Sequence, residues 1–347
     1  MNHIGRIFRI SIFGESHGPA IGAVLDGVPP GLALMPEDFE ADLARRRAGA
    51  IGTTPRVEAD IPEILSGLYR GRTSGTPLCL QVRNNDTRSA DYDAFVAVPR
   101  PGHADFSGRV RYRGFNDTRG SGHFSGRLTT CLVAAGVVAK KLLPQVVFTT
   151  KLIEAGGNPD VQAAVQQAVD AGDSVGALVE IRIQGVPAGI GEPFFGSLEG
   201  ELSRAIFAVP GVRGIEFGDG FEASRMRGSA HNDPFVTADG RTAKNGAGGI
   251  NGGISNGNEI VIRVAMKPAS TIAAPQETLD FSTRSKTTLE GAGRHDACIA
   301  IRAAVALEAA CAVTLADLSL IARTYDSGTV INPGTKSDSG TKMEDQV

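Results

Sequence analysis

The sequence is poor in the features that mark nucleic-acid-binding proteins. Its 347 residues include no tryptophan, and aromatic residues make up only 5% of the chain. This composition argues against the stacking platforms on which proteins bind single-stranded nucleic acid. Lys and Arg together number 35 against 38 Asp and Glu, so the net charge is −3 and no overall basic field attracts polyanions or an anionic membrane surface. Any anion-binding site must therefore be local.

Cysteines and long apolar runs are also scarce. The four cysteines show neither the CxxC spacing of metal sites nor the density of a disulfide framework; they are Cys79, Cys131, Cys298 and Cys311. The longest apolar run, residues 131–139, is too short to span a bilayer. Residues 1–13 lack the apolar block of a signal peptide. We therefore expect a cytoplasmic protein.

Glycine and arginine, by contrast, are plentiful. The chain contains 44 glycines and 18 prolines, which predicts many tight turns and sites built on loops rather than a helical bundle. Its cations are 27 arginines and only 8 lysines. This bias suits bidentate binding of carboxylates and phosphates.

The pattern of apolar residues predicts one domain over residues 1–333. It is followed by a polar segment, 334–347, with the composition of a disordered tail. Strands are expected at 6–13, 21–26, 78–83, 177–184 and 259–266, and helices at 36–47, 127–143, 159–171, 198–208 and 297–318. Two of the helices, 127–143 and 297–318, are apolar almost all round, which predicts burial on most faces. The expected class is α+β: a β-α-β sandwich with a central helix layer between antiparallel sheets.

The first candidate site is the segment GESHG, residues 14–18, which follows a predicted strand. It has the spacing of the G-x-S-x-G elbow that presents the nucleophile of serine hydrolases. An elbow leads directly into a helix, however, and here a second strand follows. A glycine-rich turn with local hydrogen bonds from Ser16 and His17 is the alternative, and a serine hydrolase using Ser16 stays open as a hypothesis.

The second candidate is the block of residues 100–127, which contains six arginines and two histidines. Its glycine-rich end runs straight into the apolar helix at 127–143, so free backbone N–H groups and the helix dipole favour an anion there. A solvated basic loop capped by Ser125 is the alternative, and a non-catalytic polyanion-binding protein stays open as a second hypothesis.

Three further features bear on an anion site. At most one or two of Arg45, Arg46 and Arg47 can face the same target, because successive helical residues point about 100° apart. Asp296 is placed to cap the helix at 297–318, and Arg302 within that helix needs an anionic partner if it is buried. The segments 252–257 and 267–271 could line a phosphate-bearing cofactor, or they could be ordinary turns.

No metal site is expected. The six histidines are widely scattered and lie in none of the usual ligand motifs; they are His3, His17, His103, His123, His231 and His295. Histidines spread in this way are better suited to acid and base work.

Together these segments closely resemble the chorismate synthase family. The matching stretches run in the family's order from about residue 5 to about 318. They are FGESHGPAIGAVLDGVPPG, RRRAG, RPGHAD, the glycine-rich lead into the helix at 127–143, GVPAGIGEPFF, GIEFGDGF, GGISNG, KPAST and GRHDACIAIRA. The resemblance implies a lyase of the shikimate pathway. Such an enzyme converts 5-enolpyruvylshikimate-3-phosphate to chorismate by 1,4-anti elimination of phosphate. The family requires reduced FMN although no net redox change occurs.

The resemblance also implies roles for individual residues. His17 would protonate the departing phosphate, His103 would act near flavin N1, and Asp296 would work with flavin N5 in removing the substrate proton. The implied substrate-binding residues are Ser16, Arg46, Arg119, Arg127 and Arg302. The implied flavin contacts are His123, Phe124, Ser125, Pro210, Gly211, Gly252, Lys267, Pro268, Ala269, Ser270, Thr271 and Arg294. A homotetramer is implied, with NADPH only as a flavin reductant and with the reducing system supplied from outside.

The chain departs from the common family pattern at two places. The sequence HFSGRL, residues 123–128, stands where the family usually has RSSARE, so one flavin-contacting arginine and one acid are missing. After the three arginines, the chain reads AGAIG, one residue shorter and without the usual proline and further arginine. Both departures affect the regions expected to bind FMN and NADPH.

Overall fold

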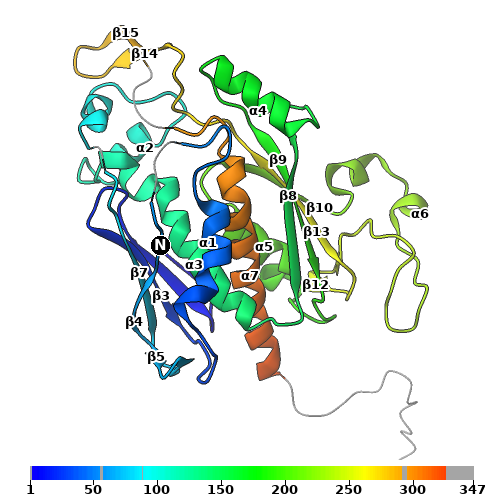
Figure 1. Cartoon of the computed structure of the whole chain (residues 1–347). Helices are drawn as coiled ribbons and strands as arrows, with labels where there is room; N and C mark the ends of the chain where they lie inside the picture. Colours follow the sequence, from blue (N-terminus) through cyan, green and yellow to red (C-terminus); the bar gives the residue numbers. More distant parts are fainter. Residues whose placement is uncertain (1, 55–57, 88, 291–294, 326–347) are drawn as a thin grey trace, which may run out of the picture.

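Two antiparallel sheets enclose a layer of helices in the computed structural model, which describes residues 2–54, 58–87, 89–290 and 295–325 (Figure 1). The first sheet has the strand order β1-β2-β3-β7-β4 and the second β10-β13-β9-β8. Helices α3 (Thr129–Lys141) and α7 (Ala300–Thr324) lie side by side between them. This arrangement confirms the predicted β-α-β sandwich.

The first sheet is built mainly from the N-terminal part of the chain. Its strands are β1 (His3–Ile4), β2 (Arg9–Gly14), β3 (Ala20–Asp26), β7 (Leu78–Arg83) and β4 (Glu63–Ser66). Burial alternates along β7, because one of its faces packs on the helix layer, whereas β3 also buries three consecutive residues, Ile21 to Ala23. The second sheet consists of β8 (Val147–Ala155), β9 (Ala177–Gln184), β10 (Val212–Phe217) and β13 (Ile260–Met266).

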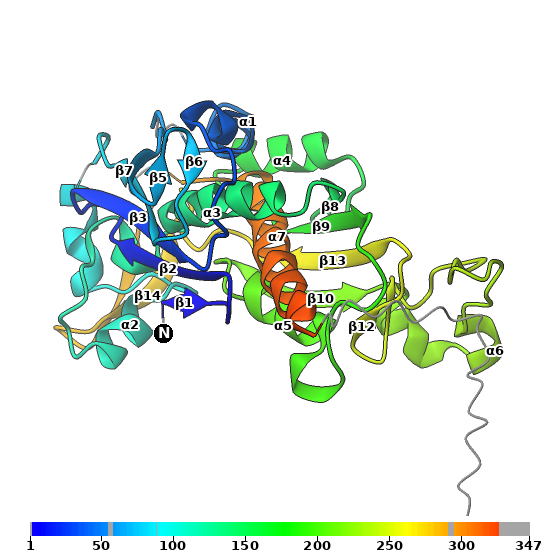
Figure 2. The same cartoon turned by 90° about the horizontal axis from the view of Figure 1, so that it is seen from below.

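The remaining elements surround these layers. The helices are α1 (Glu40–Arg46), α2 (Asp105–Arg111), α4 (Val161–Asp170), α5 (Leu198–Ile206) and α6 (Gly228–His231). Three short hairpins are formed by β5 (Leu68–Tyr69) with β6 (Arg72–Thr73), β11 (Ile250–Asn251) with β12 (Ile254–Ser255), and β14 (Gln276–Asp280) with β15 (Ser285–Leu289). Figure 2 shows β14 and α2 together at one end of the molecule and α6 at the other.

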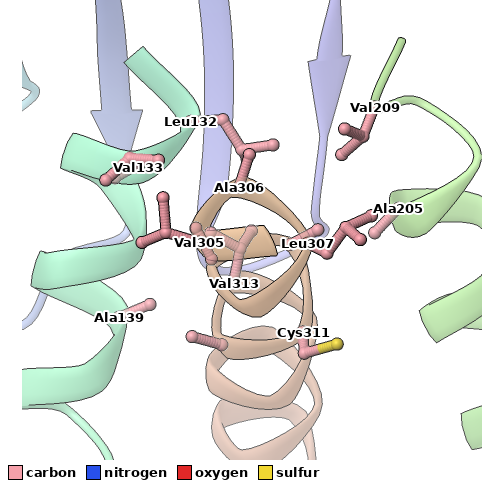
Figure 3. Packing of buried hydrophobic residues seen from close by; sticks show 14 of the residues in the cluster. Leu132, Val133, Ala139, Ala205, Val209, Val305, Ala306, Leu307, Cys311 and Val313 are labelled. Atoms are coloured by element: carbon pink, nitrogen blue, oxygen red, sulfur yellow. The ribbon is translucent and has the colours of Figure 1, made fainter. Parts of the chain in front are cut away.

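Small side chains allow the two central helices to approach closely. Every residue from Thr130 to Ala139 of α3 is buried, and so is every residue from Ala304 to Leu318 of α7. A Cβ atom added at Gly136 would lie only 2.5 Å from Cβ of Ala309. Figure 3 shows Leu132 and Val133 of α3 packed beside Val305 and Ala306 of α7. Close packing of apolar side chains on all faces holds this layer in place.

The composition of α7 would allow it to cross a membrane, but its surroundings make it a core helix. It is 25 residues long with a mean hydropathy of 1.8 over its most apolar stretch, and 83% of that stretch is buried within the protein. Its apolar surface is therefore already covered by α3, α1, α5 and the second sheet.

The predicted elements agree with the structure in type and differ at their ends. Strands 78–83 and 177–184 occur as expected, and the predicted inner helices begin two to three residues later than expected. The predicted helix 36–47 is a 3-10 turn, Pro36–Phe39, followed by α1. Strands β8 and β10, the hairpin β14–β15 and helix α2 were not anticipated. The predicted tail, 334–347, lies outside the described residues.

Candidate active site

A cavity of about 620 Å³ opens where one end of the helix layer meets the loops between the two sheets. This volume is ordinary for a small-molecule site. Six cationic side chains line it against three carboxylates; they are Arg46, Arg47, Arg100, Arg127, Lys267 and Arg302, facing Glu58, Asp60 and Asp296. The excess of positive charge makes the cavity a site for anions.

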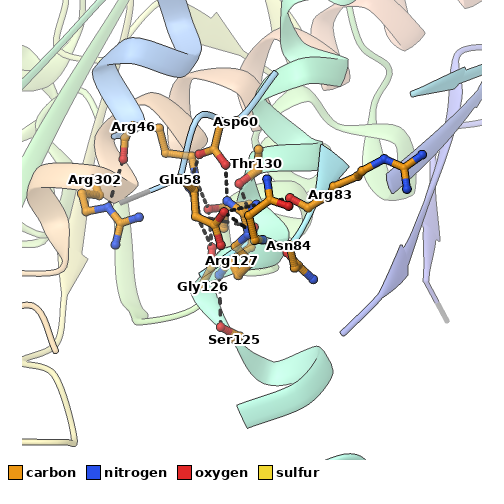
Figure 4. A network of polar contacts seen from close by, with 12 residues as sticks. Arg46, Glu58, Asp60, Arg83, Asn84, Ser125, Gly126, Arg127, Thr130 and Arg302 are labelled. Atoms are coloured by element: carbon orange, nitrogen blue, oxygen red, sulfur yellow. Dashed lines mark hydrogen bonds and ion pairs between the residues drawn. The ribbon is translucent and has the colours of Figure 1, made fainter. Parts of the chain in front are cut away.

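Buried arginines form one wall of this cavity. Arg46 ends α1 with its side chain 3% exposed, and its Nη1 lies 3.2 Å from Oδ2 of Asp60. Arg127 donates to the other oxygen of the same carboxylate and, through Nε, to Oδ1 of Asn84 at 3.0 Å. Figure 4 shows Asp60 between the two arginines, with Arg302 beyond Arg46. The network presents three guanidinium groups to one space.

The electrostatics of Arg46 favour a bound anion. Burial and, next to it, the charge of the neighbouring Arg302 lower the pKa of Arg46 to about 9; Arg127 acts in the same direction and Asp60 opposes them. A lowered pKa means that the charged guanidinium is disfavoured in the ligand-free protein. A carboxylate or phosphate in the cavity would relieve this cost.

The local sequence explains how Arg127 reaches the cavity. Gly120 and Gly122 have positive φ angles, which turn the chain sharply before a 3-10 turn at Gly126–Leu128. Ser125 caps that turn by accepting a hydrogen bond from the Arg127 N–H at 3.2 Å. The predicted glycine-rich lead into α3 is therefore present, with Ser125 as its cap.

Ser16 and His17 lie on the turn between β2 and β3. His17 Nδ1 is 3.1 Å from Oγ of Ser89, and its ring meets Tyr92 edge-on at 5.2 Å between centroids. A Cβ at Gly120 would overlap the His17 ring, so the glycine permits this approach. The chain continues into β3 at Ala20 rather than into a helix, so GESHG lacks the strand–turn–helix context of a nucleophile elbow.

A second histidine, His103, forms a polar cluster with Asp105 and Arg100. His103 Nδ1 lies 2.6 Å from Oδ1 of Asp105, and Arg100 holds both oxygens of that carboxylate at 2.8 and 2.9 Å. The guanidinium of Arg100 also lies over the Phe95 ring, 4.3 Å from its centroid. Burial would raise the pKa of Asp105, but the hydrogen bonds from Arg100 and His103 hold it well below its ordinary value.

Asp296 does not cap α7, contrary to expectation. The helix begins at Ala300, and Ile299 at its N-cap makes no side-chain bond. Instead, Oδ1 of Asp296 accepts a hydrogen bond from the Thr54 N–H at 2.8 Å, and Oδ2 lies 3.3 Å from Nη1 of Arg302. The carboxylate is thereby held at the cavity by a backbone amide from a distant loop and by the arginine two turns along the chain.

The remaining walls suit a planar ring with a phosphate. Phe124, Val209, Pro210 and Ile299 supply aromatic and apolar surface. Lys267 Nζ donates to the carbonyl of Gly102 at 2.7 Å and to Oγ of Ser270 at 2.6 Å, so a cation and a hydroxyl stand together. The buried Nδ1 of His295, also at the cavity, has no hydrogen-bond partner among the described residues. These groups fit an aromatic cofactor with an anionic side chain.

Most of the sequence-predicted residues line this cavity. They are Ser16, His17, Arg46, His103, His123, Phe124, Ser125, Arg127, Pro210, Gly211, Lys267, Ala269, Ser270, Thr271, Asp296 and Arg302.

Four predicted residues are not among those lining the cavity in the described structure. Arg119 is half exposed and pairs with Asp117, while Gly252 is exposed at the β11–β12 turn. Pro268 does not line the cavity, although Lys267 before it and Ala269 after it do. Arg294 lies outside the described residues.

Sequence reasoning missed Glu58, Asp60, Tyr92 and Phe95, which also line the cavity. None of them stands in a motif, because each is brought to the site only by tertiary packing. No group of three or more His, Cys, Asp or Glu residues that could hold a metal ion occurs among the described residues.

Comparison with known proteins agrees with this architecture. The chorismate synthase family matches residues 8–320. A chorismate synthase of Chitinophaga pinensis is 51% identical over 322 residues, which cover 92% of this chain and 97% of the relative. One from Dehalococcoides mccartyi is 44% identical over 351 residues, covering 92% and 96%. A crystal structure of chorismate synthase superimposes with a TM-score of 0.70 at 26% identity, covering 92% of this chain and 93% of that one.

The comparisons support neither the serine hydrolase nor the polyanion-binding hypothesis. They agree with one another in sequence, in fold and over nearly the full length of both partners. The chain belongs to the chorismate synthase family, and it is a lyase of the shikimate pathway with chorismate synthase activity.

Proposed function

We propose that the cavity binds 5-enolpyruvylshikimate-3-phosphate beside reduced FMN and that its side chains carry out the 1,4-anti elimination of phosphate. The observation that carries this proposal is that one cavity brings together five arginines, four histidines and Asp296. The substrate is an anion with two carboxylates and a phosphate. It therefore needs several fixed cations and a proton donor at the leaving group.

The arginines hold and orient the substrate. Arg46, Arg127 and Arg302 present guanidinium groups from three different elements, which suits the separate anionic groups of one small molecule. Ser16 lines the same cavity. Arg119, the fifth predicted substrate-binding residue, lies outside it. Fixing the substrate in this way removes much of the entropic barrier to reaction.

Two residues carry out the proton transfers at the phosphate and at the substrate ring. His17 donates a proton to the departing phosphate as a general acid, and its position is supported by the contacts with Ser89 and Tyr92. Asp296 assists the removal of the ring proton. Its carboxylate is held by the Thr54 amide and Arg302, so it can face the substrate without turning away to solvent.

The second half of the cavity would hold the cofactor. Phe124, Pro210 and Ile299 would contact the flavin ring, while Lys267, Ser270 and Thr271 would bind its phosphate-bearing chain. The buried Nδ1 of His295, which has no hydrogen-bond partner among the described residues, adds a polar group at the cavity for a ligand to bind. Reduced FMN, when bound, supplies electron density to the substrate ring and returns unchanged in oxidation state. His103 would stabilise the anionic reduced flavin from its place at the cavity wall.

The compartment, the assembly and the source of electrons can also be inferred. We propose a cytoplasmic homotetramer that depends on an external reductant, with NADPH acting only through that reductant. Four free cysteines support a reducing compartment. Exposed aromatic residues Phe194 and Phe195 support contact with another copy of the chain.

Anaerobic formation of chorismate tests the proposal. The protein is assayed with dithionite-reduced FMN and, separately, with NADPH and oxidised FMN. We expect turnover with dithionite and none with NADPH alone. Turnover in both assays would contradict the external reductant, and no turnover from folded protein would contradict the substrate assignment.

Replacing His17 tests the proton donor. His17→Ala should lower turnover with reduced FMN by about a hundredfold, the usual contribution of general acid catalysis. His3→Ala is the matched control, because His3 is exposed on β1 and does not line the cavity. Full turnover in His17→Ala would remove the role assigned to this residue.

A further inference from the structure

A largely buried carboxylate, that of Asp105, lies behind His103 at the cavity wall. Asp105, the first residue of α2, lies 2.6 Å from His103 Nδ1, and the two side chains are 14% and 19% exposed. His103 itself lines the cavity, whereas Asp105 does not. Asp105 can therefore influence a bound ligand only through the histidine.

The geometry around Nδ1 selects one tautomer. Nδ1 has two close neighbours, Oδ1 of Asp105 at 2.6 Å and Nη2 of Arg100 at 3.1 Å. A bare Nδ1 lone pair 2.6 Å from a carboxylate oxygen would be strongly repelled, so Nδ1 must carry hydrogen. Arg100 Nη2 does not need Nδ1 as an acceptor, because its two hydrogens are taken by Asp105 Oδ1 at 2.8 Å and Ser121 Oγ at 3.0 Å.

The carboxylate is itself fixed from behind. Oδ2 of Asp105 accepts hydrogen bonds from Arg100 Nε at 2.9 Å and from the Arg100 backbone N–H at 3.0 Å. Arg100 is 5% exposed and is further held by Oγ1 of Thr271 at 3.1 Å. Beyond this cluster, Lys267 Nζ donates to the carbonyl of Gly102, the residue before His103, at 2.7 Å. The arrangement resists rotation of either side chain.

We propose that Asp105 is a positioning residue that keeps a proton on His103 Nδ1 and so presents Nε2 to the cavity as the ring nitrogen that meets the ligand. No described residue is hydrogen-bonded to Nε2. Neutral His103 then offers an acceptor at Nε2, and protonated His103 offers a donor there. This inference rests on the proposed role of His103 at the flavin.

The substitution Asp105→Asn makes a definite prediction about the proton. An amide NH2 at the Oδ2 position would face two donors of Arg100, whereas at the Oδ1 position it would face one donor and His103 Nδ1. The second orientation has the smaller conflict. In this orientation the amide donates to Nδ1, which becomes an acceptor. The ring hydrogen then moves to Nε2, so Nε2 changes from an acceptor to a donor toward the cavity.

The test uses solid-state 15N spectra of the ligand-free protein labelled at histidine, at a pH where the rings are neutral. His103→Gln identifies the His103 signals. We expect a protonated Nδ1 and a bare Nε2 in the wild type, and the reverse in Asp105→Asn. With dithionite-reduced FMN, Asp105→Asn should lose about tenfold or more in kcat with little change in the substrate KM. Asp105→Glu should recover part of this loss.

The chain supplies a matched control in His231 and Asp219. Their Nδ1 to Oδ2 distance is 2.9 Å, both side chains are about one-third exposed, and neither lines the cavity. Asp219→Asn should alter only the His231 signals and leave turnover unchanged. Thermal unfolding of each variant shows whether the fold is intact.

The outcomes separate this inference from the proposed function. A bare Nδ1 on His103 in the wild type overturns the inference, and so does an inverted tautomer in Asp105→Asn with full kcat. Full turnover in His103→Gln instead removes the role of His103 in the proposed function. In that case the nitrogen spectra still decide whether Asp105 places the proton.

Discussion

At the scale of single residues, Asp60 is the point on which the arginine wall depends. Its two oxygens are shared between Arg46 and Arg127, and all three side chains are less than 5% exposed. Removing one partner of a buried charge network leaves the other charges without compensation. A second buried carboxylate, Glu58, lies 3.9 Å from Nη2 of Arg127, but only Asp60 contacts both arginines.

Asp60→Asn should lower the free energy of unfolding by about 3–5 kcal/mol in the ligand-free protein, because two buried guanidiniums lose their shared counter-charge. Urea unfolding at neutral pH measures the change. Glu63→Gln is the control, since the Glu63–Arg83 pair is exposed and should contribute little. Equal effects of the two substitutions would contradict the special position of Asp60.

The residues that sequence reasoning missed or misplaced share a physical cause. Asp296 has the sequence context of a helix cap, yet its partners are the Thr54 amide, 242 residues away, and Arg302. Asp60 stands in no motif, and its importance comes from contact with Arg46 and Arg127. Motifs such as the lead to Arg127 could be predicted because their geometry is local. Ion pairs between distant segments could not.

At the scale of elements, one buried glutamate ties three helices together. Glu308 of α7 is bonded to Arg45 of α1 at 2.7 and 2.8 Å and to Lys140 of α3 at 2.5 Å. Burial raises the pKa of Glu308, but the hydrogen bonds and charges of Arg45 and Lys140 outweigh this effect and lower it below 4.5. The folded state therefore binds the Glu308 proton more weakly than the unfolded state does.

The sign of the pH dependence follows from this lowered pKa. The stabilisation by Glu308 is fully present above the unfolded value of 4.5 and is lost as the pH falls through the folded value. Unfolding free energies of wild type and Glu308→Gln, measured from pH 7 to pH 3, should therefore converge at low pH. Glu222→Gln, in an exposed pair with Arg225, should show no such convergence. A constant gap for Glu308→Gln would contradict the assignment.

The close contact between α3 and α7 depends on Gly136, which has no side chain. Gly136→Val should destabilise the protein by about 1–3 kcal/mol or more, because the new side chain overlaps Ala309 in a packed core. Thermal unfolding measures the effect. Gly228→Ala in α6 is the control, since its nearest foreign atom is 4.0 Å away. A stable Gly136→Val protein would mean that the two helices can separate at little cost.

The central layer was also the easiest part of the fold to predict. Helices α3 and α7 are apolar on almost every face, and this pattern has few interpretations other than an inner layer. Strand β10 was missed because Arg213, Gly214 and Glu216 break its apolar alternation, and its place is set by pairing with β13. Helix α2 contains Gly108 and three charged residues in seven positions, so its sequence carries no clear helical stripe.

At the scale of the whole molecule, we propose that two exposed aromatic side chains mark the place where copies of the chain meet. Phe194 and Phe195 are 87% and 100% exposed, and they adjoin α5 on the side of the second sheet. Large apolar side chains exposed together are unfavourable in a lone subunit and are typical of interfaces. The site, in contrast, gathers its arginines and histidines within one chain.

Replacing Phe194 and Phe195 together by serine should therefore shift the protein from the proposed tetramer of 36.1 kDa chains to smaller species. The reason is the loss of apolar area that association would bury. Light scattering coupled to size-exclusion chromatography measures the mass. Tyr325→Ser, which removes a 74% exposed aromatic at the end of α7, should leave the mass unchanged. A double variant that remains tetrameric would place the subunit contacts elsewhere on the surface, and a wild-type monomer would refute the assembly itself.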